Sequence, residues 1–385
     1  MAAGILTINS GSSSLKVALY NGPQLLYRIV VNRTGDSAEL SMSEGARDKP
    51  AISSLPDYTP AAGADRILEI LHQQFGDPSI RAVGHRVVHG GNGFGKPVII
   101  DKAVLAKLRA LEPMAPMHQR DSLDLVQVWQ QRLDDVPQVA CFDTAFHRGQ
   151  HEIEKRYALP DELFAEGLHR YGFHGLSYES IVAVLQRSHP GIADRPVVIA
   201  HLGAGCSMCA TRRGKSVSTS MGFSTAEGLP MATRSGSVDP GVLIYLMRHK
   251  GLGVDELEDL LYRKSGLLGL SGTSSGMREL RQQSTPASDM TIDYFAHRCV
   301  QEIGRLAATL GGLEGLVFTG GIGENDAGIR QQIADRCQWL GVEIDPDENK
   351  SSAETISTAD SRVRVLVIPA DEEGVIAAHT LKLIS

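Results

Sequence analysis

The sequence predicts an α/β protein built from two related domains that face one ligand. A chain of 385 residues exceeds the usual size of a single domain. An apolar run, a turn of small residues and a second apolar run occur at residues 4–20, and the same order recurs at 197–211. Short apolar runs separated by glycine-containing turns are typical of β-strands. Two such units about half a chain apart indicate a duplicated domain.

The two turns consist of residues that contribute little to a hydrophobic core. The first is the Asn-Ser-Gly-Ser-Ser-Ser segment at 9–14, and the second is Gly-Ala-Gly at 203–205. Glycine lets the backbone approach a ligand closely, and successive backbone N–H groups can surround an anion. An ordinary hairpin explains either segment alone, but the repetition favours an anion site.

Composition argues against several classes of protein. The net charge of −7 is unsuited to a nucleic-acid-binding surface. No apolar run approaches the roughly 18 residues of a membrane span. The N-terminus lacks the basic segment of a signal peptide. Cys206 and Cys209 are spaced C-x-x-C, but residues i and i+3 of a strand point to opposite faces, so we expect no redox or zinc site there. The expected location is cytoplasmic, with no nucleic-acid or membrane partner.

The N-terminal part of the chain is expected to alternate strands and helices. After the first hairpin, strands are expected at 25–32, 38–43, 81–91, 98–101 and 136–146, and helices at 57–75, 102–111 and 122–133. Arg86 lies in an apolar run, so it needs an anionic partner, which a protein carboxylate or a ligand can supply. Asp143 follows a strand, where open α/β sheets place ligands; the alternative is that it caps a helix. The segment 90–97 nearly matches a P-loop, but Pro97 lacks the hydroxyl that would ligate magnesium, so we expect no phosphate site there.

The C-terminal part is expected to begin after the strand at 136–146. Strands are expected at 197–200, 206–211, 216–220, 316–319 and 363–368, and helices at 152–163, 177–186, 239–250, 255–262, 277–282, 292–310, 327–340 and 371–383. His174 lies in a loop between glycine and aromatic residues, where it either contacts a ligand or is solvated. A glycine loop at 320–325 joins a strand to a helix, a geometry that suits a nucleotide. The acidic residues 371–373 could act at the site or complement the dipole of the last helix.

Nine motifs, in order along nearly the whole chain, resemble those of the acetokinase family, meaning acetate kinase and its propionate and butyrate relatives. They are NSGSSSLK at 9–16, GHRVVHGG at 84–91, FDTAFH at 142–147, YGFHGLS at 171–177, HLGAGCS at 201–207, TSMGF at 219–223, EGL at 227–229, TRSG at 233–236 and GGIGEN at 320–325. The resemblance implies two ribonuclease-H-like, actin-like domains with a nucleotide cleft between them. Residues 1–146 with the C-terminal helix 371–385 would form the first domain, and residues 147–370 the second.

The resemblance also implies a reaction. ATP and a short-chain carboxylate, most simply acetate, would give ADP and an acyl phosphate by direct in-line transfer, reversibly and with Mg²⁺ or Mn²⁺, in a homodimer. Arg86 and Arg234 would hold the carboxylate and the transferring phosphate, His174 would bind the phosphoryl oxygens, and Asp143 would be the catalytic aspartate. The pocket for the alkyl group would be formed by Val88, Met117 and Phe173. Phosphate and nucleotide contacts would come from Lys16, His201, Gly203, Gly205, Gly321, Gly323 and Asn325, and metal contacts from Asn9 and Glu372.

Several positions depart from the family pattern. Ala204 replaces an asparagine, Ser218 and Ser237 replace aspartates, Thr225 replaces a proline, and Asp371 replaces an asparagine. The two serines are expected to remove acidic groups beside the phosphates and to weaken metal binding. Two alternatives therefore stay open: a kinase that prefers propionate or butyrate, and an actin-like protein that binds or hydrolyses ATP without transferring phosphate to an acid.

Overall fold

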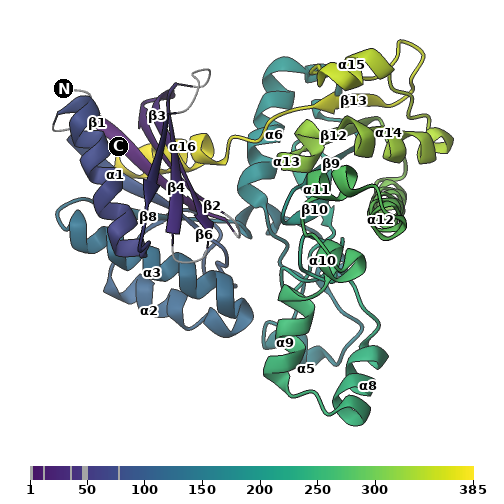
Figure 1. The fold of residues 1–385 in the computed structure, drawn as a ribbon, viewed down its shortest axis with the longest axis horizontal. Helices are drawn as coiled ribbons and strands as arrows, with labels where there is room; N and C mark the ends of the chain where they lie inside the picture. Colours follow the sequence, from purple (N-terminus) through teal and green to yellow (C-terminus); the bar gives the residue numbers. More distant parts are fainter. Residues whose placement is uncertain (1–2, 12–13, 35–36, 46–50, 77–78) are drawn as a thin grey trace. The chain divides into compact units, whose positions relative to one another are not determined.

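The computed structural model describes residues 3–11, 14–34, 37–45, 51–76 and 79–385. The chain divides into two compact units. Unit 1 comprises Met1–Ala145 and Asp371–Ser385, and unit 2 comprises Phe146–Ala370. Each unit contains one β-sheet with helices packed against it (Figure 1). The two-domain α/β class expected from the sequence is therefore confirmed.

The sheet of unit 1 has eight strands in the order β5-β4-β3-β2-β1-β6-β8-β7. These are β1 Ala3–Ser10, β2 Ser14–Asn21, β3 Gln24–Thr34, β4 Ser37–Glu44, β5 Ala51–Leu55, β6 Ser79–Val87, β7 Val98–Ile99 and β8 Gln138–Phe142. Strand β1 pairs antiparallel with β2 and parallel with β6, and β6 pairs parallel with β8. The parallel strands β1, β6 and β8 therefore end at one edge of the sheet. Strand β5 was not expected from the sequence.

Helices cover both faces of this sheet. They are α1 Pro60–Phe75, α2 Lys102–Arg109, α3 Pro116–Arg132 and α16 Glu372–Ile384. Adjacent residues of β1 point to opposite faces: Leu6 joins the core beneath α1 and α3, and Ile5 joins the core beneath α16. Gly84 of β6 allows α16 to lie close, since a Cβ there would be 2.3 Å from Thr380 Oγ1. The yellow C-terminal helix thus lies on the purple N-terminal strands (Figure 1).

The sheet of unit 2 has five strands in the order β11-β10-β9-β12-β13. These are β9 Val197–Leu202, β10 Cys206–Arg212, β11 Lys215–Thr219, β12 Gly315–Thr319 and β13 Arg364–Val367. Strand β9 pairs antiparallel with β10 and parallel with β12, as β1 pairs with β2 and β6 in unit 1. The two units therefore share a strand arrangement, and the duplication predicted from the sequence is present.

The structure describes every residue of unit 2, which contains twelve α-helices. They are α4 Glu152–Lys155, α5 Asp161–Ala165, α6 Gly175–Ser188, α7 Pro190–Ala193, α8 Pro240–Lys250, α9 Val254–Arg263, α10 Gly266–Ser271, α11 Met277–Gln283, α12 Pro286–Leu310, α13 Gly320–Asn325, α14 Ala327–Arg336 and α15 Pro346–Ser351. Helix α6 packs on β9 with Tyr178 and Ile181 in the core, and α12 packs on β9, β10 and β11. In the described part of the chain, no helix is both long and apolar enough to span a membrane.

Several sequence expectations about helices were wrong, and four of them have a clear structural description. The helix expected at 152–163 is two short helices, because the backbone is extended at Arg156 and again at Pro160, which precedes the second helix as its N-cap. The glycine loop at 320–325 is itself the helix α13. The next helix ends at Arg336 instead of residue 340. Helix α3 begins at Pro116 within the segment expected to be turn, because proline is favoured at the first helical position.

Candidate active site

The carboxyl ends of β1, β6 and β8 bring polar side chains together in unit 1. The Nε and Nη2 atoms of Arg86 donate to Oδ2 of Asp143 at 2.9 and 2.6 Å. The Nη1 atom donates to Oδ1 of Asn9 at 3.2 Å and lies 3.7 Å from Oε2 of Glu372. Burial alone would lower the pKa of Arg86, but the charges of Asp143 and Glu372 raise it overall. The guanidinium is therefore held charged beside two carboxylates.

The start of α16 completes this cluster. The Nδ2 atom of Asn9 donates to Oε2 of Glu372 at 2.7 Å and to Oε1 of Glu373 at 2.6 Å. Burial and then the nearby Glu372 charge raise the pKa of Glu373, although Lys16, opposite Asn9 on β2, opposes that rise. Glu373 was not singled out from the sequence, where its only signal was a run of three acidic residues.

Asp371 is the N-cap of α16. Its Oδ1 atom accepts from the backbone N–H of Gly374 at 3.1 Å. Asparagine and aspartate cap helices equally well. The departure from the family pattern at position 371 therefore leaves this helix start intact.

Val88 lies just beyond the end of β6 and is buried, with 4% of its surface exposed. The adjacent backbone at His89 is held on both sides by the side chain of Gln119: Oε1 accepts from His89 N–H at 2.9 Å, and Nε2 donates to the His89 carbonyl at 3.1 Å. Met117 belongs to the first turn of α3, and its side chain lies outside the described residues. Gln119 was not expected as a site residue, yet it fixes the backbone that carries Val88.

His174 and His201 form a second cluster, which lies in unit 2. His174 precedes α6 with a φ of 58°, a left-handed conformation that is uncommon for a residue with a side chain. Its Nδ1 atom is 2.8 Å from Oγ of Ser207. The His174 ring stacks on that of His201, with 4.4 Å between centroids. The Nδ1 atom of His201 in turn lies 2.8 Å from Oγ of Ser177. The His174 ring is therefore fixed in orientation.

The turn at 203–205 lies against the same residues. A Cβ atom at Gly205 would be 3.2 Å from Nε2 of His174 and 3.9 Å from Nη1 of Arg234. Arg234 is buried, and its Nη1 atom donates to the carbonyl of Thr225 at 3.1 Å. The acceptor is the backbone carbonyl of Thr225, which a proline at this position would also have. The replacement of proline by threonine therefore keeps this hydrogen bond. The structure therefore brings His174, Gly205 and Arg234 together.

Helix α13 lies beside this turn. A Cβ atom at Gly203 would be 3.6 Å from the backbone nitrogen of Gly321. Gly321 and Asn325 also line a pocket of about 750 Å³ between α11, α13 and α14. Gly323 is different, because a Cβ there would contact the carbonyl of Ala200 at 3.6 Å. Gly323 therefore packs α13 onto the sheet and is absent from the lining of the pocket.

The same pocket contains residues that sequence reasoning missed. Its wall on α11 includes Met277, Arg278 and Gln282. An ion pair holds this wall in place, since Nε of Arg281 donates to both carboxylate oxygens of Asp326 at 3.1 and 2.9 Å. Pockets of a few hundred cubic ångströms with largely apolar walls are typical of small-molecule sites. This one has room for a nucleoside.

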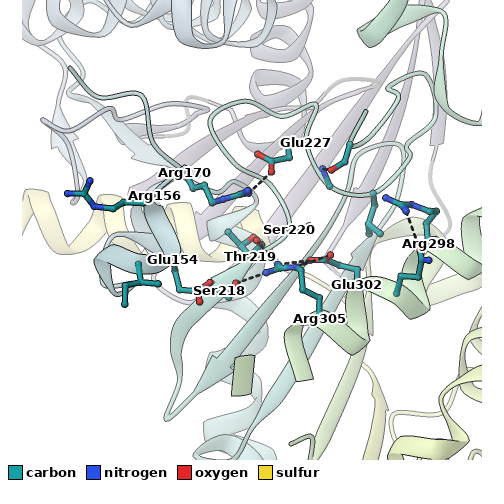
Figure 2. Close-up of a pocket in the computed structure, with 15 residues that line it drawn as sticks. Glu154, Arg156, Arg170, Ser218, Thr219, Ser220, Glu227, Arg298, Glu302 and Arg305 are labelled. Carbon is teal, nitrogen blue, oxygen red and sulfur yellow. Dashed lines mark hydrogen bonds and ion pairs between the residues drawn. The ribbon is translucent and has the colours of Figure 1, made fainter. Parts of the chain in front are cut away.

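Ser218 and Ser237 are both held by hydrogen bonds within unit 2. Ser218 is opposite Ala210 on β10, five residues from Gly205 and therefore about 17 Å along the strand. Its Oγ atom accepts from Nη1 of Arg305 at 3.2 Å. Ser237 accepts from the backbone N–H of Gly228 at 3.0 Å. The expectation that an acidic residue at 218 would lie beside the phosphate turn was wrong, because the register of β10 and β11 separates them. Both serines line another pocket. Figure 2 shows this pocket and labels Ser218.

Phe173, the remaining residue expected at the acid pocket, is buried in unit 2, and His147 holds its backbone. The Nε2 atom of His147 is 2.9 Å from the Phe173 carbonyl, and Nδ1 is 2.8 Å from Oγ of Ser216. Burial lowers the pKa of His147 to about 4. In unit 1, burial likewise lowers the pKa of His85, whose Nε2 lies 2.7 Å from Gln138 Oε1, to about 4. Both imidazoles are therefore neutral at pH 7.

These two histidines predict acid sensitivity. The pKa of each histidine in the folded protein lies below the unfolded value of about 6.5. The contribution of each neutral imidazole to the free energy of unfolding is therefore complete above pH 6.5 and is lost as the pH falls toward 4. Each depressed group is expected to cost up to about 3 kcal/mol of stability at pH 4. Urea unfolding at several pH values should show this, and His147→Gln should reduce the pH slope. A stability that is unchanged between pH 7 and 4.5 would contradict the expectation.

Comparison with known protein sequences points to one family. A model of the acetokinase family matches residues 4–378. The acetate kinase of Nitrobacter hamburgensis is 44% identical over 99% of this chain and 96% of that protein. The acetate kinase of Methylocella silvestris is 44% identical over 100% of this chain and 98% of that protein.

Solved structures agree with these sequences. A propionate kinase from Francisella tularensis superposes with a TM-score of 0.90 at 34% identity and covers 99% of both chains. The acetate kinase of Porphyromonas gingivalis superposes with a TM-score of 0.86 at 34% identity and covers 100% of both chains.

Proposed function

The chain belongs to the acetokinase family, and we propose that it transfers phosphate from ATP to acetate with the two arginine-containing clusters described above. The products are acetyl phosphate and ADP, and ATP is the co-substrate. The observation that carries the reaction is the full-length similarity to curated acetate kinases at 42–44% identity. The experiment that tests it is acyl-hydroxamate formation from ATP, Mg²⁺ and a panel of carboxylates.

Arg86 and Arg234 are proposed to bind the carboxylate and the transferring phosphoryl group. Phosphoryl transfer requires that the reacting groups are aligned and that positively charged side chains lie beside the equatorial oxygens. It requires little covalent help from the protein. A guanidinium matches both carboxylate and phosphate through two parallel N–H groups. His174 is proposed to donate from Nε2 to the phosphoryl oxygens, because Nδ1 is engaged with Ser207. Asp143 is proposed to hold Arg86 in place and to carry negative charge next to the reacting groups.

ATP is proposed to bind along the turn at 203–205 and the pocket beside α13. Gly203 and Gly205 leave room for phosphates, with Lys16 and His201 as further phosphate contacts. The proximity of Gly203 to the backbone nitrogen of Gly321 supports this path, since it joins the turn to the pocket of about 750 Å³. Gly321 and Asn325 would then contact the adenosine.

A divalent cation, Mg²⁺ or Mn²⁺, is proposed to accompany ATP and to neutralise charge on its phosphates. No group of three or more histidine, cysteine or acidic side chains among the described residues forms a metal cage. Mg²⁺ usually binds one or two carboxylates and completes its shell with water and substrate phosphates. Glu372 and Asn9 suit that role, because both are buried and the start of α16 brings Glu372 to within 2.7 Å of Asn9 at the end of β1.

Propionate is the second candidate acceptor. The high structural similarity to a protein described as a propionate kinase favours it. We nevertheless propose that acetate is preferred, because Val88 and Phe173 are bulky residues at the positions assigned to the pocket wall.

Replacing Val88 with alanine should narrow the preference for acetate. The wild type is expected to use acetate best, propionate less well and butyrate poorly. The backbone next to Val88 is held by Gln119, so the variant should gain space instead of collapsing. One methylene in an apolar pocket is worth roughly 1–3 kcal/mol, so propionate kcat/KM should rise several-fold relative to acetate. An unchanged ratio, or a wild type that uses butyrate as well as acetate, would exclude this assignment.

A homodimer in the cytoplasm is proposed from the family resemblance. Helix α8 exposes apolar side chains, including Val242, Ile244, Tyr245 and Met247, each between 45% and 54% exposed. Exposed apolar groups on one helix are typical of an interface between subunits.

A further inference from the structure

The loop at 222–236 of unit 2 contains both Arg234 and an acceptor for its guanidinium. Arg234 is buried, and its Nη1 atom donates to the backbone carbonyl of Thr225 at 3.1 Å. Thr225 is buried as well, with 7% of its surface exposed. The placement of the guanidinium therefore depends on where the loop puts the Thr225 carbonyl.

Tyr157 joins this loop on both sides of Thr225. Its hydroxyl accepts from the backbone N–H of Phe223 at 2.8 Å and donates to Oε2 of Glu227 at 2.6 Å. Phe223 lies two residues before Thr225, and Glu227 lies two residues after it. One hydroxyl group from outside the loop therefore closes the segment 223–227, and the carbonyl that holds Arg234 is at the middle of that segment.

Arg170 holds the other oxygen of the Glu227 carboxylate. Its Nη1 atom lies 2.5 Å from Oε1 of Glu227, and Figure 2 shows this pair at the edge of the pocket. The Cζ atom of Arg170 also lies 4.6 Å from the centroid of the Tyr157 ring. Burial, and then the hydrogen bond to Glu227, raises the pKa of Tyr157, so its hydroxyl stays a donor at neutral pH. Both oxygens of Glu227 are therefore engaged by residues outside the loop.

The first residue of the loop contacts the segment that leads into His174. The Gly222 carbonyl accepts from the backbone N–H groups of Tyr171 and Gly172 at 3.0 and 3.2 Å. These two residues directly follow Arg170, the partner of Glu227. The loop is therefore tied to the segment 170–172 by its backbone and by the Glu227 side chain.

Gly222 leaves the space that this arrangement needs. A Cβ atom there would be 1.8 Å from Oε2 of Glu227 and 2.2 Å from the Tyr157 hydroxyl. A side chain at position 222 would therefore push the carboxylate and the hydroxyl away from the loop. The backbone of the loop and the Glu227 carboxylate are packed against each other.

We propose that Glu227 is a positioning residue for phosphoryl transfer, which holds the segment 223–227 through Tyr157 and Arg170 and thereby orients the guanidinium of Arg234. The proposal rests on the function proposed above for Arg234. Without the carboxylate, the Thr225 carbonyl is free to shift, and the guanidinium shifts with it. A displacement of about 1 Å in a reacting group can cost about a hundredfold in rate.

The stability of the protein should depend little on this carboxylate. The side chains of Arg170 and Glu227 are 29% and 28% exposed. Ion pairs that solvent reaches contribute little to the free energy of unfolding. The melting temperature of Glu227→Ala should therefore stay within about 4 °C of the wild type.

Steady-state kinetics of acyl-hydroxamate formation from ATP and acetate test the proposal. Glu227→Ala should lower kcat by about tenfold or more, with the KM for ATP within about threefold of the wild type, because the nucleotide contacts are assigned outside the loop. Glu227→Gln keeps an acceptor for Tyr157 and should recover most of the lost kcat. Gly222→Ala should lower kcat as Glu227→Ala does. Glu154→Ala is the matched control: it removes another carboxylate from the lining of the same pocket and should keep kcat within about twofold of the wild type.

A double variant with Arg234→Ala separates positioning from a purely structural role. If Glu227 acts through Arg234, the kcat of Glu227→Ala/Arg234→Ala should be within about twofold of that of Arg234→Ala alone. If Glu227 only maintains the fold, the two losses multiply. Multiplied losses, or a Glu227→Ala variant with the kcat of the wild type, would overturn the proposal.

The same measurements distinguish this proposal from the function on which it rests. Near-normal turnover in Arg234→Ala would overturn the role of Arg234 and the positioning role of Glu227 with it. A large loss in Arg234→Ala together with wild-type kcat in Glu227→Ala would leave the role of Arg234 intact and overturn only the proposal for Glu227.

Discussion

Replacing Arg234 with alanine is expected to lower kcat by about a hundredfold or more while the protein stays folded. A hundredfold loss corresponds to roughly 2.7 kcal/mol of transition-state stabilisation, a typical value for removing one charged or polar donor to a developing oxyanion. The guanidinium lies next to Gly205 and His174, so it faces the turn assigned to the phosphates. Acetyl-hydroxamate formation at saturating ATP and acetate measures the loss.

Lysine at position 234 should rescue little of this activity. It restores the charge but lacks the planar fork that binds two oxygens at once. Arg212→Ala is a suitable control, because Arg212 ends the strand that begins beside the turn and thus lies at its other end. Near-normal turnover in Arg234→Ala, or equal losses in the Arg234 and Arg212 variants, would exclude Arg234 from the reaction centre.

The sequence predicted the sheets better than the helices around them. Strands β1, β2, β9 and β10 are mostly apolar runs next to turns that contain glycine, so local composition indicates them. Helix α13 was missed because glycine disfavours helix, yet its first residue packs against the end of β9: a Cβ at Gly320 would be 2.7 Å from the Leu202 carbonyl. Tertiary packing therefore overrides local propensity there, and no local pattern could have shown it.

In the candidate site, too, some contacts follow from local sequence and others depend on the whole fold. The contact between Arg86 and Asp143 follows from two strands that run parallel and end at one edge, which apolar runs in the sequence can indicate. The position of Ser218 depends on the register of β10 and β11, which the sequence does not specify. The wall of the nucleoside-sized pocket depends on an ion pair between Arg281 and Asp326, 45 residues apart. Such long-range pairings are decided by the whole fold.

The Asp143→Asn variant is expected to lose at least a hundredfold in kcat. The carboxylate accepts two hydrogen bonds from Arg86, and its charge lies among groups assigned to the metal and the phosphoryl group. Asparagine keeps the size of the side chain and an oxygen that can accept from Arg86, but it removes the charge. Arg86 also remains bonded to Asn9 and close to Glu372, which limits the loss of stability.

Two measurements on this variant separate catalysis from structure. Removing one partner of a buried ion pair can destabilise a protein by about 3–5 kcal/mol, so the melting temperature must be measured beside kcat. If Asp143 acts in the reaction, the loss of kcat persists well below the melting temperature, where the variant is folded. The charge is then required in the folded enzyme, whatever its effect on stability. If Asp143 serves only as the counter-ion of Arg86, the melting temperature falls while the folded variant keeps its specific activity, and the catalytic assignment is wrong.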